Sequence, residues 1–276
     1  MEITRGGIKL PVRVIAYGVD GIGKTSFAAE SDNPIFIPTE DGCNRLDVPQ
    51  FPLVESWNQL FDNLRQLAKE KHSYKTVVLD SADWAQYLAM EHIVKTDYKG
   101  DSSKFDAYGA GYKDLSREWR KLLSAFDYLR KVRNMQVLFL AHAVVKTFKN
   151  PAGDDYDQYK ATLVDTPSTS IWGMTKEWSD IVLFMNYKVT VKKESAKSAK
   201  GKGIMSAGKR VCYSSPNAAW DAKTRVGWTL PNEFELNWDV FKKYISGKKT
   251  NPDVEPENEI DTENETLTEK ELEHAI

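Results

Sequence analysis

Residues 11–26 contain the feature that most constrains the fold, a glycine-rich turn between an apolar run and a helix-forming segment. Residues 12–16 are mostly apolar and β-branched, which predicts a buried strand. Residues 18–25 read Gly-Val-Asp-Gly-Ile-Gly-Lys-Thr and fit the P-loop pattern G-x-x-x-x-G-K-[ST]. The glycines let backbone N–H groups converge on one phosphate, and the dipole of the following helix adds to the attraction. The sequence therefore predicts a phosphate-binding loop rather than an ordinary turn before a helix.

The residues of this loop have separate predicted roles toward ATP and Mg²⁺. Lys24 is expected to reach the β- and γ-phosphates, and the Thr25 hydroxyl is expected to hold Mg²⁺. Without a ligand, Lys24 is expected to face solvent. The predicted nucleotide contacts are Gly18, Val19, Asp20, Gly21, Ile22, Gly23, Lys24, Thr25 and Ser26.

Three further apolar runs are predicted strands that end in polar side chains. Residues 33–38 lead to Glu40 and Asp41, residues 74–79 lead to Asp80, and residues 135–141 lead to His142. The carboxyl ends of parallel strands meet at the ligand-binding edge of an open α/β sheet, so we expect these groups to converge there.

Asp80 and His142 each have a second interpretation. An apolar run ending in Asp80 fits the Walker B pattern, in which the acid orients water or Mg²⁺ beside Thr25. Asp80 could equally cap the helix that follows. A lone histidine at a strand end is often structural, but the other groups expected at this edge favour a sensing role for His142.

The rest of the chain is predicted as follows. Helices are expected over 56–71, with Ser56 as N-cap, and over 82–95, 113–133 and 238–245. Glycines and aromatic residues over 97–112 predict a loop with exposed aromatic side chains. From 144 to 171 no period is sustained, which predicts a functional stretch without regular structure. Strands are expected near 180–191 and 210–236, with a flexible basic hairpin tip over 192–210.

The net charge of −2 conceals a strong asymmetry along the 276 residues. Residues 250–276 contain ten acidic residues and one lysine, a net charge of −9, so the remainder carries +7. A basic core with an acidic tail is typical of proteins that contact nucleic acid, although a solubilising tail on an ordinary surface is the alternative. We expect one ATPase domain over 1–247 and a disordered acidic tail over 248–276.

Basic residues mark two candidate DNA-binding segments. In the first, lysines alternate with aromatic side chains, and in the second they accompany serine, alanine and glycine; the candidates are Lys146, Lys149, Lys160, Lys197, Lys200 and Lys202. Two cysteines without metal-ligand spacing fit a reducing cytoplasm. The sequence has no apolar run of transmembrane length and no signal-peptide pattern, so neither a membrane partner nor export is expected.

Together these motifs resemble the RecA/RadA-type ATPase core, in particular small phage ATP-binding proteins that include RecA-like single-strand annealing proteins. The resemblance covers about residues 10–240 and includes 18–25, 36–42, 74–81, 138–142 and 221–225. It implies that Glu40 activates the attacking water and that His142, where RecA has glutamine, senses the γ-phosphate and leads into a DNA-binding loop. It also implies that Lys223 and Arg225 reach the ATP of a neighbouring subunit. By this resemblance we expect no counterpart of RecA's N-terminal helix and strand for polymerisation in residues 1–276.

The expected fold is α/β, with a RecA-like P-loop NTPase core, a mostly parallel central sheet flanked by helices, and an antiparallel extension. The expected function is ATP-dependent binding and annealing or recombination of single-stranded DNA by a homo-oligomer, a ring or a filament. A single-strand-binding protein is a further candidate partner. The alternative is a nucleotide-gated interaction protein such as a helicase loader, with little turnover. A small-molecule kinase is a third reading, weakened because no arginine-rich lid is evident.

Overall fold

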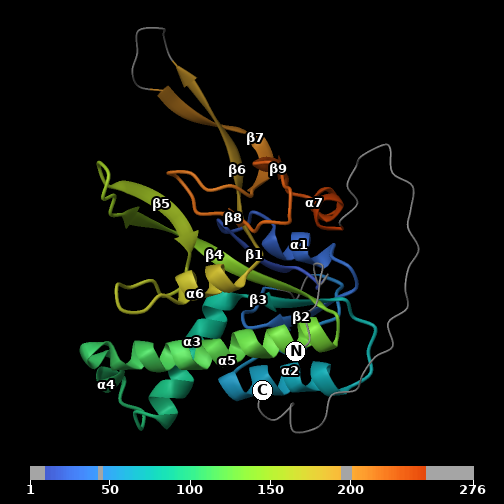
Figure 1. The fold of residues 1–276 in the computed structure, drawn as a ribbon, viewed down its shortest axis with the longest axis vertical. Coiled ribbons are helices and arrows are strands. Elements are labelled where there is room, and N and C mark those ends of the chain that lie inside the picture. Colours follow the sequence, from blue (N-terminus) through green and yellow to red (C-terminus); the bar gives the residue numbers. More distant parts are fainter. Residues whose placement is uncertain (1–9, 43–45, 194–200, 247–276) are drawn as a thin grey trace, which may run out of the picture.

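The structure is a computed structural model, and it describes residues 10–42, 46–193 and 201–246 (Figure 1). Within these residues a nine-stranded sheet has the order β2-β3-β4-β1-β6-β7-β9, with β5 paired to β4 and β8 paired to β6. The strands are β1 Arg13–Gly18, β2 Pro34–Pro38, β3 Thr76–Asp80, β4 Gln136–Phe148, β5 Tyr156–Ala161, β6 Ile181–Lys193, β7 Gly201–Tyr213, β8 Lys223–Thr224 and β9 Glu233–Glu235. The helices are α1 Lys24–Ala29, α2 Trp57–Lys69, α3 Ala82–Thr96, α4 Ser102–Asp106, η1 Ala107–Gly109, α5 Ala110–Val132, α6 Ile171–Trp178 and α7 Trp238–Ile245.

The central strands are parallel, and the strands added after them are antiparallel. Strands β2, β3, β4, β1 and β6 pair in parallel, whereas β7 pairs antiparallel with β6 and with β9. This arrangement confirms the predicted α/β class with a mostly parallel central sheet, flanking helices and an antiparallel extension. It is the organisation of a P-loop NTPase core.

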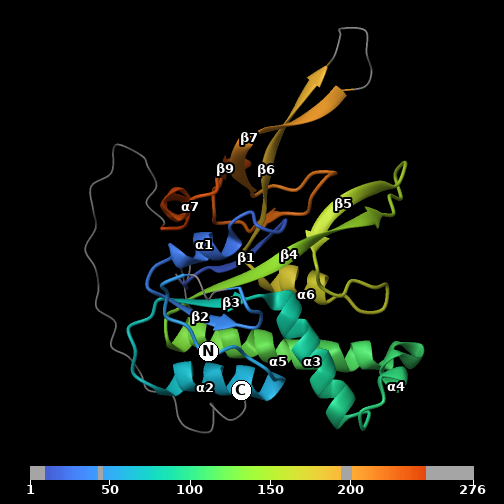
Figure 2. The same cartoon turned by 180° about the vertical axis from the view of Figure 1, so that it is seen from behind.

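Helices cover both faces of the sheet (Figures 1 and 2). On β1, Ile15 and Tyr17 face the cluster formed with α2, α3 and α5, while Val14 and Ala16 face the cluster formed with α1 and α7. This alternation follows from the period of two along a strand. Because both faces of the strand contact apolar clusters, β1 is buried almost throughout. This packing fixes the strand that leads into the loop after Gly18.

The main helical predictions are confirmed. Helix α2 begins after Ser56, whose hydroxyl accepts a hydrogen bond from the Gln59 backbone N–H, as expected for an N-cap. In α5 the buried apolar side chains recur every three or four residues, which gives a continuous stripe toward the sheet. That stripe contains Leu115, Trp119, Leu122, Phe126 and Leu129.

The prediction of a loop with exposed aromatic side chains over 97–112 is wrong. This stretch contains α4, η1 and the start of α5, and Phe105 is only 2% exposed. Phe105 lies edge-on against both Tyr98 and Tyr112. Gly111 permits this packing, because a Cβ atom there would lie 2.3 Å from the Phe105 ring.

The prediction of an irregular stretch over 144–171 is also wrong. Strand β4 continues to Phe148, and residues 143–148 pair antiparallel with β5 to form a hairpin. Helix α6 then begins after Ser170, whose side chain accepts a hydrogen bond from Gly173. The hairpin projects from the sheet (Figures 1 and 2), so its residues lack the regularly buried face that makes a strand recognisable.

The basic hairpin predicted over 192–210 is formed by β6 and β7 where the structure describes it. Residues 194–200, which include Lys197 and Lys200, and the predicted acidic tail over 248–276 lie outside the described residues. No helix in the described ranges combines the length and the apolar character needed to cross a membrane.

Candidate nucleotide site

The P-loop connects β1 to α1 through two glycines in left-handed backbone conformations. Gly21 has φ 70° and Gly23, the N-cap of α1, has φ 104°, values that L-amino acids with a side chain rarely adopt. At the start of the loop, a Cβ atom on Gly18 would lie 2.4 Å from the carbonyl oxygen of Met185. Gly23 has no side chain to cap the first amides of α1, so these donors suit a phosphate group.

The expectation that Lys24 faces solvent without a ligand is wrong. Its side chain turns back onto the loop, where Nζ donates hydrogen bonds to the carbonyl oxygens of Gly18 at 3.1 Å and Val19 at 3.3 Å. The residue is only 7% exposed, and this burial lowers the pKa of its ammonium group, opposed by the charge of Asp20. The side chain of Lys24 therefore lies along the predicted phosphate-binding loop.

Thr25 and Asp80 form the pair that fits a magnesium ion. The Thr25 hydroxyl donates a hydrogen bond of 2.9 Å to Asp80 Oδ2, although the residues are far apart in the chain. Asp80 ends β3 and is buried. Mg²⁺ usually takes one or two carboxylates or hydroxyls together with phosphate oxygens and water, so this donor set fits a nucleotide-bound ion. The N-cap position of the helix after Asp80 is Ser81, whose side chain makes no capping hydrogen bond.

Glu40 and His142 face one another at the same edge. Strand β4 lies between β1 and β3, and its register places His142 beside Gly18. His142 Nε2 is 3.8 Å from Glu40 Oε1 and 3.8 Å from Asp20 Oδ1. The structure thus brings together the P-loop, Asp80, Glu40 and His142, as predicted from their positions at strand ends.

Asp83 is a site residue that the sequence analysis missed. It lies in the first turn of α3, is buried, and accepts hydrogen bonds from His142 Nδ1 at 2.8 Å and from the His142 backbone N–H at 3.1 Å. These two bonds fix the imidazole so that Nε2 points toward Glu40. The sequence does contain an acid three residues after Asp80, which could have indicated this role. Acids are common in the first turn of any helix, however, because they interact favourably with the helix dipole, so the pattern is not specific.

Glu40 and His142 both have shifted pKa values. The hydrogen bond to Asp83 raises the pKa of His142, although burial opposes this. Burial raises the pKa of Glu40, and the charge of His142 acts in the opposite direction. A carboxylate with a raised pKa is a better proton acceptor, which suits a group that activates water.

Lys223 and Arg225 lie at the opposite edge of the sheet from the P-loop. Strand β8 pairs with the first residues of β6, at the amino ends of the parallel strands. Lys223 Nζ donates to the carbonyl oxygens of Lys176 at 2.6 Å and Ser179 at 2.7 Å, and Arg225 Nη2 donates to Glu177 O at 2.6 Å. They therefore bind the last carbonyl groups of α6 and do not reach the nucleotide site of their own chain.

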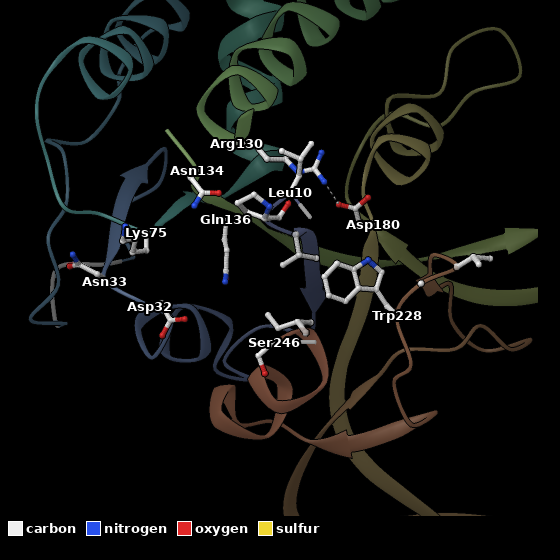
Figure 3. A pocket seen from close by; sticks show the side chains of 15 residues that line it. Leu10, Asp32, Asn33, Lys75, Arg130, Asn134, Gln136, Asp180, Trp228 and Ser246 are labelled. Carbon is white, nitrogen blue, oxygen red and sulfur yellow. Dashed lines mark hydrogen bonds and ion pairs between the residues drawn. The ribbon is translucent and has the colours of Figure 1, made fainter. Parts of the chain in front are cut away.

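A cavity of about 1170 Å³ lies at this amino-terminal edge (Figure 3). Its lining includes Arg130, whose guanidinium is 3.4 Å from Asp180, together with Gln136 and Trp228. A smaller cavity of about 380 Å³ lies beside Glu40, between the end of β2 and residues 50–53. Of these two cavities, only the smaller is at the nucleotide edge.

The lysines predicted to bind DNA in the β4–β5 region all have partners within the chain. Lys149 pairs with Asp155 at 2.5 Å and Lys160 with Asp165 at 3.0 Å, while Lys146 donates to the carbonyl oxygen of Leu163. Lys202 is in β7, opposite Lys192 of β6. The hairpin also carries a stacked pair, Phe148 and Tyr156, with ring centres 5.0 Å apart.

The fold and this edge define a protein of the P-loop nucleotide-binding class, with the architecture of an ATPase core. More particularly, the chain belongs to the family described as AAA domain, which matches residues 10–226. It is also similar to the SPbeta prophage-derived uncharacterized protein YorG of Bacillus subtilis (strain 168), with 24% identity over 180 residues. The match covers 63% of this chain and 50% of the relative, so the chain spans about half the length of that protein.

Proposed function

We propose that this protein hydrolyses ATP and binds single-stranded DNA as a RecA-like annealing or recombination protein. The observation that carries the proposal is the meeting of Glu40, His142 and the Thr25–Asp80 pair at the carboxyl edge of the sheet, around the P-loop. The similarity to a prophage-derived protein supports a phage origin.

Each residue at this edge has a distinct part in the proposed hydrolysis. The backbone amides of residues 21–25 and the Lys24 ammonium bind the phosphates, and Thr25 and Asp80 hold Mg²⁺, which supplies charge neutralisation. Glu40 accepts a proton from the attacking water. His142, oriented by Asp83, lies where its Nε2 can contact the terminal phosphate and the Glu40 carboxylate.

Glu40 favours hydrolysis over the alternative of a nucleotide-gated interaction protein such as a helicase loader. A pure switch needs phosphate and metal ligands but no base. Here a half-buried carboxylate with a raised pKa lies beside an oriented imidazole, which is an arrangement suited to proton transfer.

The β4–β5 hairpin supports the proposed contact with single-stranded DNA. Phe148 and Tyr156 line a cavity of about 530 Å³ together with Lys160, whose Nζ is 5.8 Å from the Phe148 ring centre. Aromatic faces accept any base by stacking, which gives sequence-tolerant binding. Because Lys149 and Lys160 pair with aspartates, we expect stacking to contribute more here than phosphate contacts do.

The deciding experiment is ATPase activity of the full chain with and without single-stranded DNA. Strong stimulation, reduced by F148A/Y156A but not by V145A at an exposed site on the same hairpin, supports the proposal. Turnover that DNA leaves unchanged supports the switch, and stimulation by a small metabolite instead supports a kinase.

A further inference from the structure

Arg210 of β7 flanks the P-loop on the side away from His142. Its Nη1 atom donates a hydrogen bond of 3.2 Å to the carbonyl oxygen of Ile22. A Cβ atom on Gly23 would lie only 2.6 Å from the same Nη1 atom, so the guanidinium lies directly against the loop. In the sheet, β4 and β6 are on opposite sides of β1, and β7 lies next to β6. His142 and Arg210 therefore approach the P-loop from opposite sides.

The backbone of Arg210 is anchored on both sides. It pairs with Tyr187 of β6, and its carbonyl oxygen accepts a hydrogen bond of 3.2 Å from the Leu236 N–H. Immediately before it along β7 the pairing is irregular, because Val189 pairs with Met205, and Gly208 has φ 71°. Such bulges re-aim side chains and are frequent beside functional sites. Arg210 thus projects from a fixed point next to a bulge.

The charge of Arg210 lacks an acidic counterpart in the described part of the chain. Its guanidinium bonds a neutral carbonyl rather than a carboxylate. Arg13 differs, because its guanidinium is paired with both Asp180 and Asp127. Arg210 is an exposed cation that contacts the predicted phosphate-binding loop and has no carboxylate partner among the described residues, which suits an anionic ligand.

We propose that Arg210 is a nucleotide-contact residue, supplied by the same chain, that binds the α- or β-phosphate of ATP and of ADP. Ile22 and Gly23 belong to the part of the loop whose amides cradle the α- and β-phosphates. The γ-phosphate end lies on the other side, toward Glu40 and His142. The inference rests on nucleotide binding in the proposed function and is independent of DNA binding.

The test is the affinity of the full chain for Mg-ATP and Mg-ADP, measured by competition with a fluorescent nucleotide. R210A is expected to weaken both ATP and ADP about 10- to 100-fold, the usual effect of losing a charge-assisted hydrogen bond. R210K keeps the charge but not the planar fork and is expected to recover part of the loss. K209A removes the same charge from the neighbouring exposed residue and is expected to stay within about twofold of the parent.

Two results would overturn the proposal. ADP affinity of R210A within about twofold of the parent would show that Arg210 does not contact the α- or β-phosphate. Loss of ATP affinity alone would place the contact on the γ-phosphate instead. An unaltered far-UV spectrum and melting temperature establish that R210A is folded, and R210K provides the second variant if it is not.

K24A, measured in parallel, separates this inference from the proposed function. If K24A loses nucleotide and R210A does not, only the Arg210 contact is wrong. If K24A also binds ATP as the parent does, the P-loop is not the nucleotide site, and the proposed hydrolysis fails with it.

Discussion

Glu40 and His142 act on one another through charge as well as position. With Nε2 and Oε1 3.8 Å apart, the protonated imidazole stabilises the Glu40 carboxylate, while burial of Glu40 opposes ionisation. Asp83 keeps His142 oriented and raises its pKa. The proton affinity of the proposed base therefore depends on its burial and on a histidine that belongs to a different strand.

Replacing Glu40 by glutamine is expected to separate binding from hydrolysis. The amide has nearly the size of the carboxyl group but cannot accept a proton, so E40Q should bind Mg-ATP as the parent does and lose turnover at least about 100-fold. Phosphate release and nucleotide affinity are the two measurements. Turnover of E40Q within a few-fold of the parent would mean that the base is elsewhere, with Asp41 the next candidate.

The pH dependence of turnover should shift when His142 is removed. The positive charge of His142 lowers the pKa of Glu40, so H142Q is expected to raise that pKa and move the acid limb of the profile to higher pH. Profiles of turnover against pH for H142Q and the parent provide the measurement, with H92Q, at a half-buried position in α3, as a control. An acid limb at the same pH in H142Q and the parent would contradict the proposed interaction.

At the scale of elements, α4 and α5 depend on close aromatic packing that glycine permits. Substituting alanine for Gly111 adds a methyl group that would lie 2.3 Å from the Phe105 ring. Alanine favours a helix over glycine by about 1 kcal/mol, but overpacking of this kind costs about 1–3 kcal/mol.

G111A is therefore expected to lower the free energy of unfolding by up to about 2 kcal/mol, measured by urea denaturation. K113A, at an exposed position in α5, is expected to change it by less than about 0.5 kcal/mol. A G111A variant more stable than the parent would mean that helix propensity outweighs overpacking, and that α4 can shift away from the added methyl group without loss of stability.

The strands and helices around the site show how much the sequence could predict. Gly18, Asp80 and His142 are predicted at one edge because each follows an apolar run, and parallel strands end together. Asp83 escaped prediction since its partner, His142, is 59 positions away and no local period relates them. The β4–β5 hairpin was missed because it projects from the sheet, where the alternation of buried and exposed residues is weak. Phe105 is predicted to be exposed because its sequence neighbours are polar, whereas contacts with α5 bury its side chain.

At the scale of the whole molecule, the nucleotide edge and the Lys223–Arg225 edge lie at opposite ends of the parallel strands. A head-to-tail contact between copies would bring one edge against the other, which is the geometry of rings and filaments. Lys223 and Arg225 currently bind carbonyl groups at the end of α6, so a role in a neighbour's site requires exchange of those bonds for phosphate oxygens.

We propose that copies of the chain assemble in this head-to-tail way, and mixing two variants that are each expected to lack turnover tests it. E40Q has an intact Arg225, and R225A has an intact Glu40, so a mixed assembly contains some complete sites. Turnover of the mixture is expected to exceed the sum of the two variants measured alone. R65A, at an exposed pair with Asp62, should retain parental turnover by itself. A mixture that never exceeds its components would show that Arg225 does not act at a neighbouring subunit's nucleotide.

Strand β4 runs without interruption from Gln136 through His142 to Phe148. Six residues at about 3.3 Å each separate the imidazole from the aromatic pair by about 20 Å along the strand. A tilt of the strand by about 5° at His142 would displace Phe148 by about 2 Å on this geometry, enough to disturb a base stacked there in the proposed complex. If single-stranded DNA binds at the hairpin as proposed, we expect its binding to influence the histidine that faces Glu40, because both lie on this one strand.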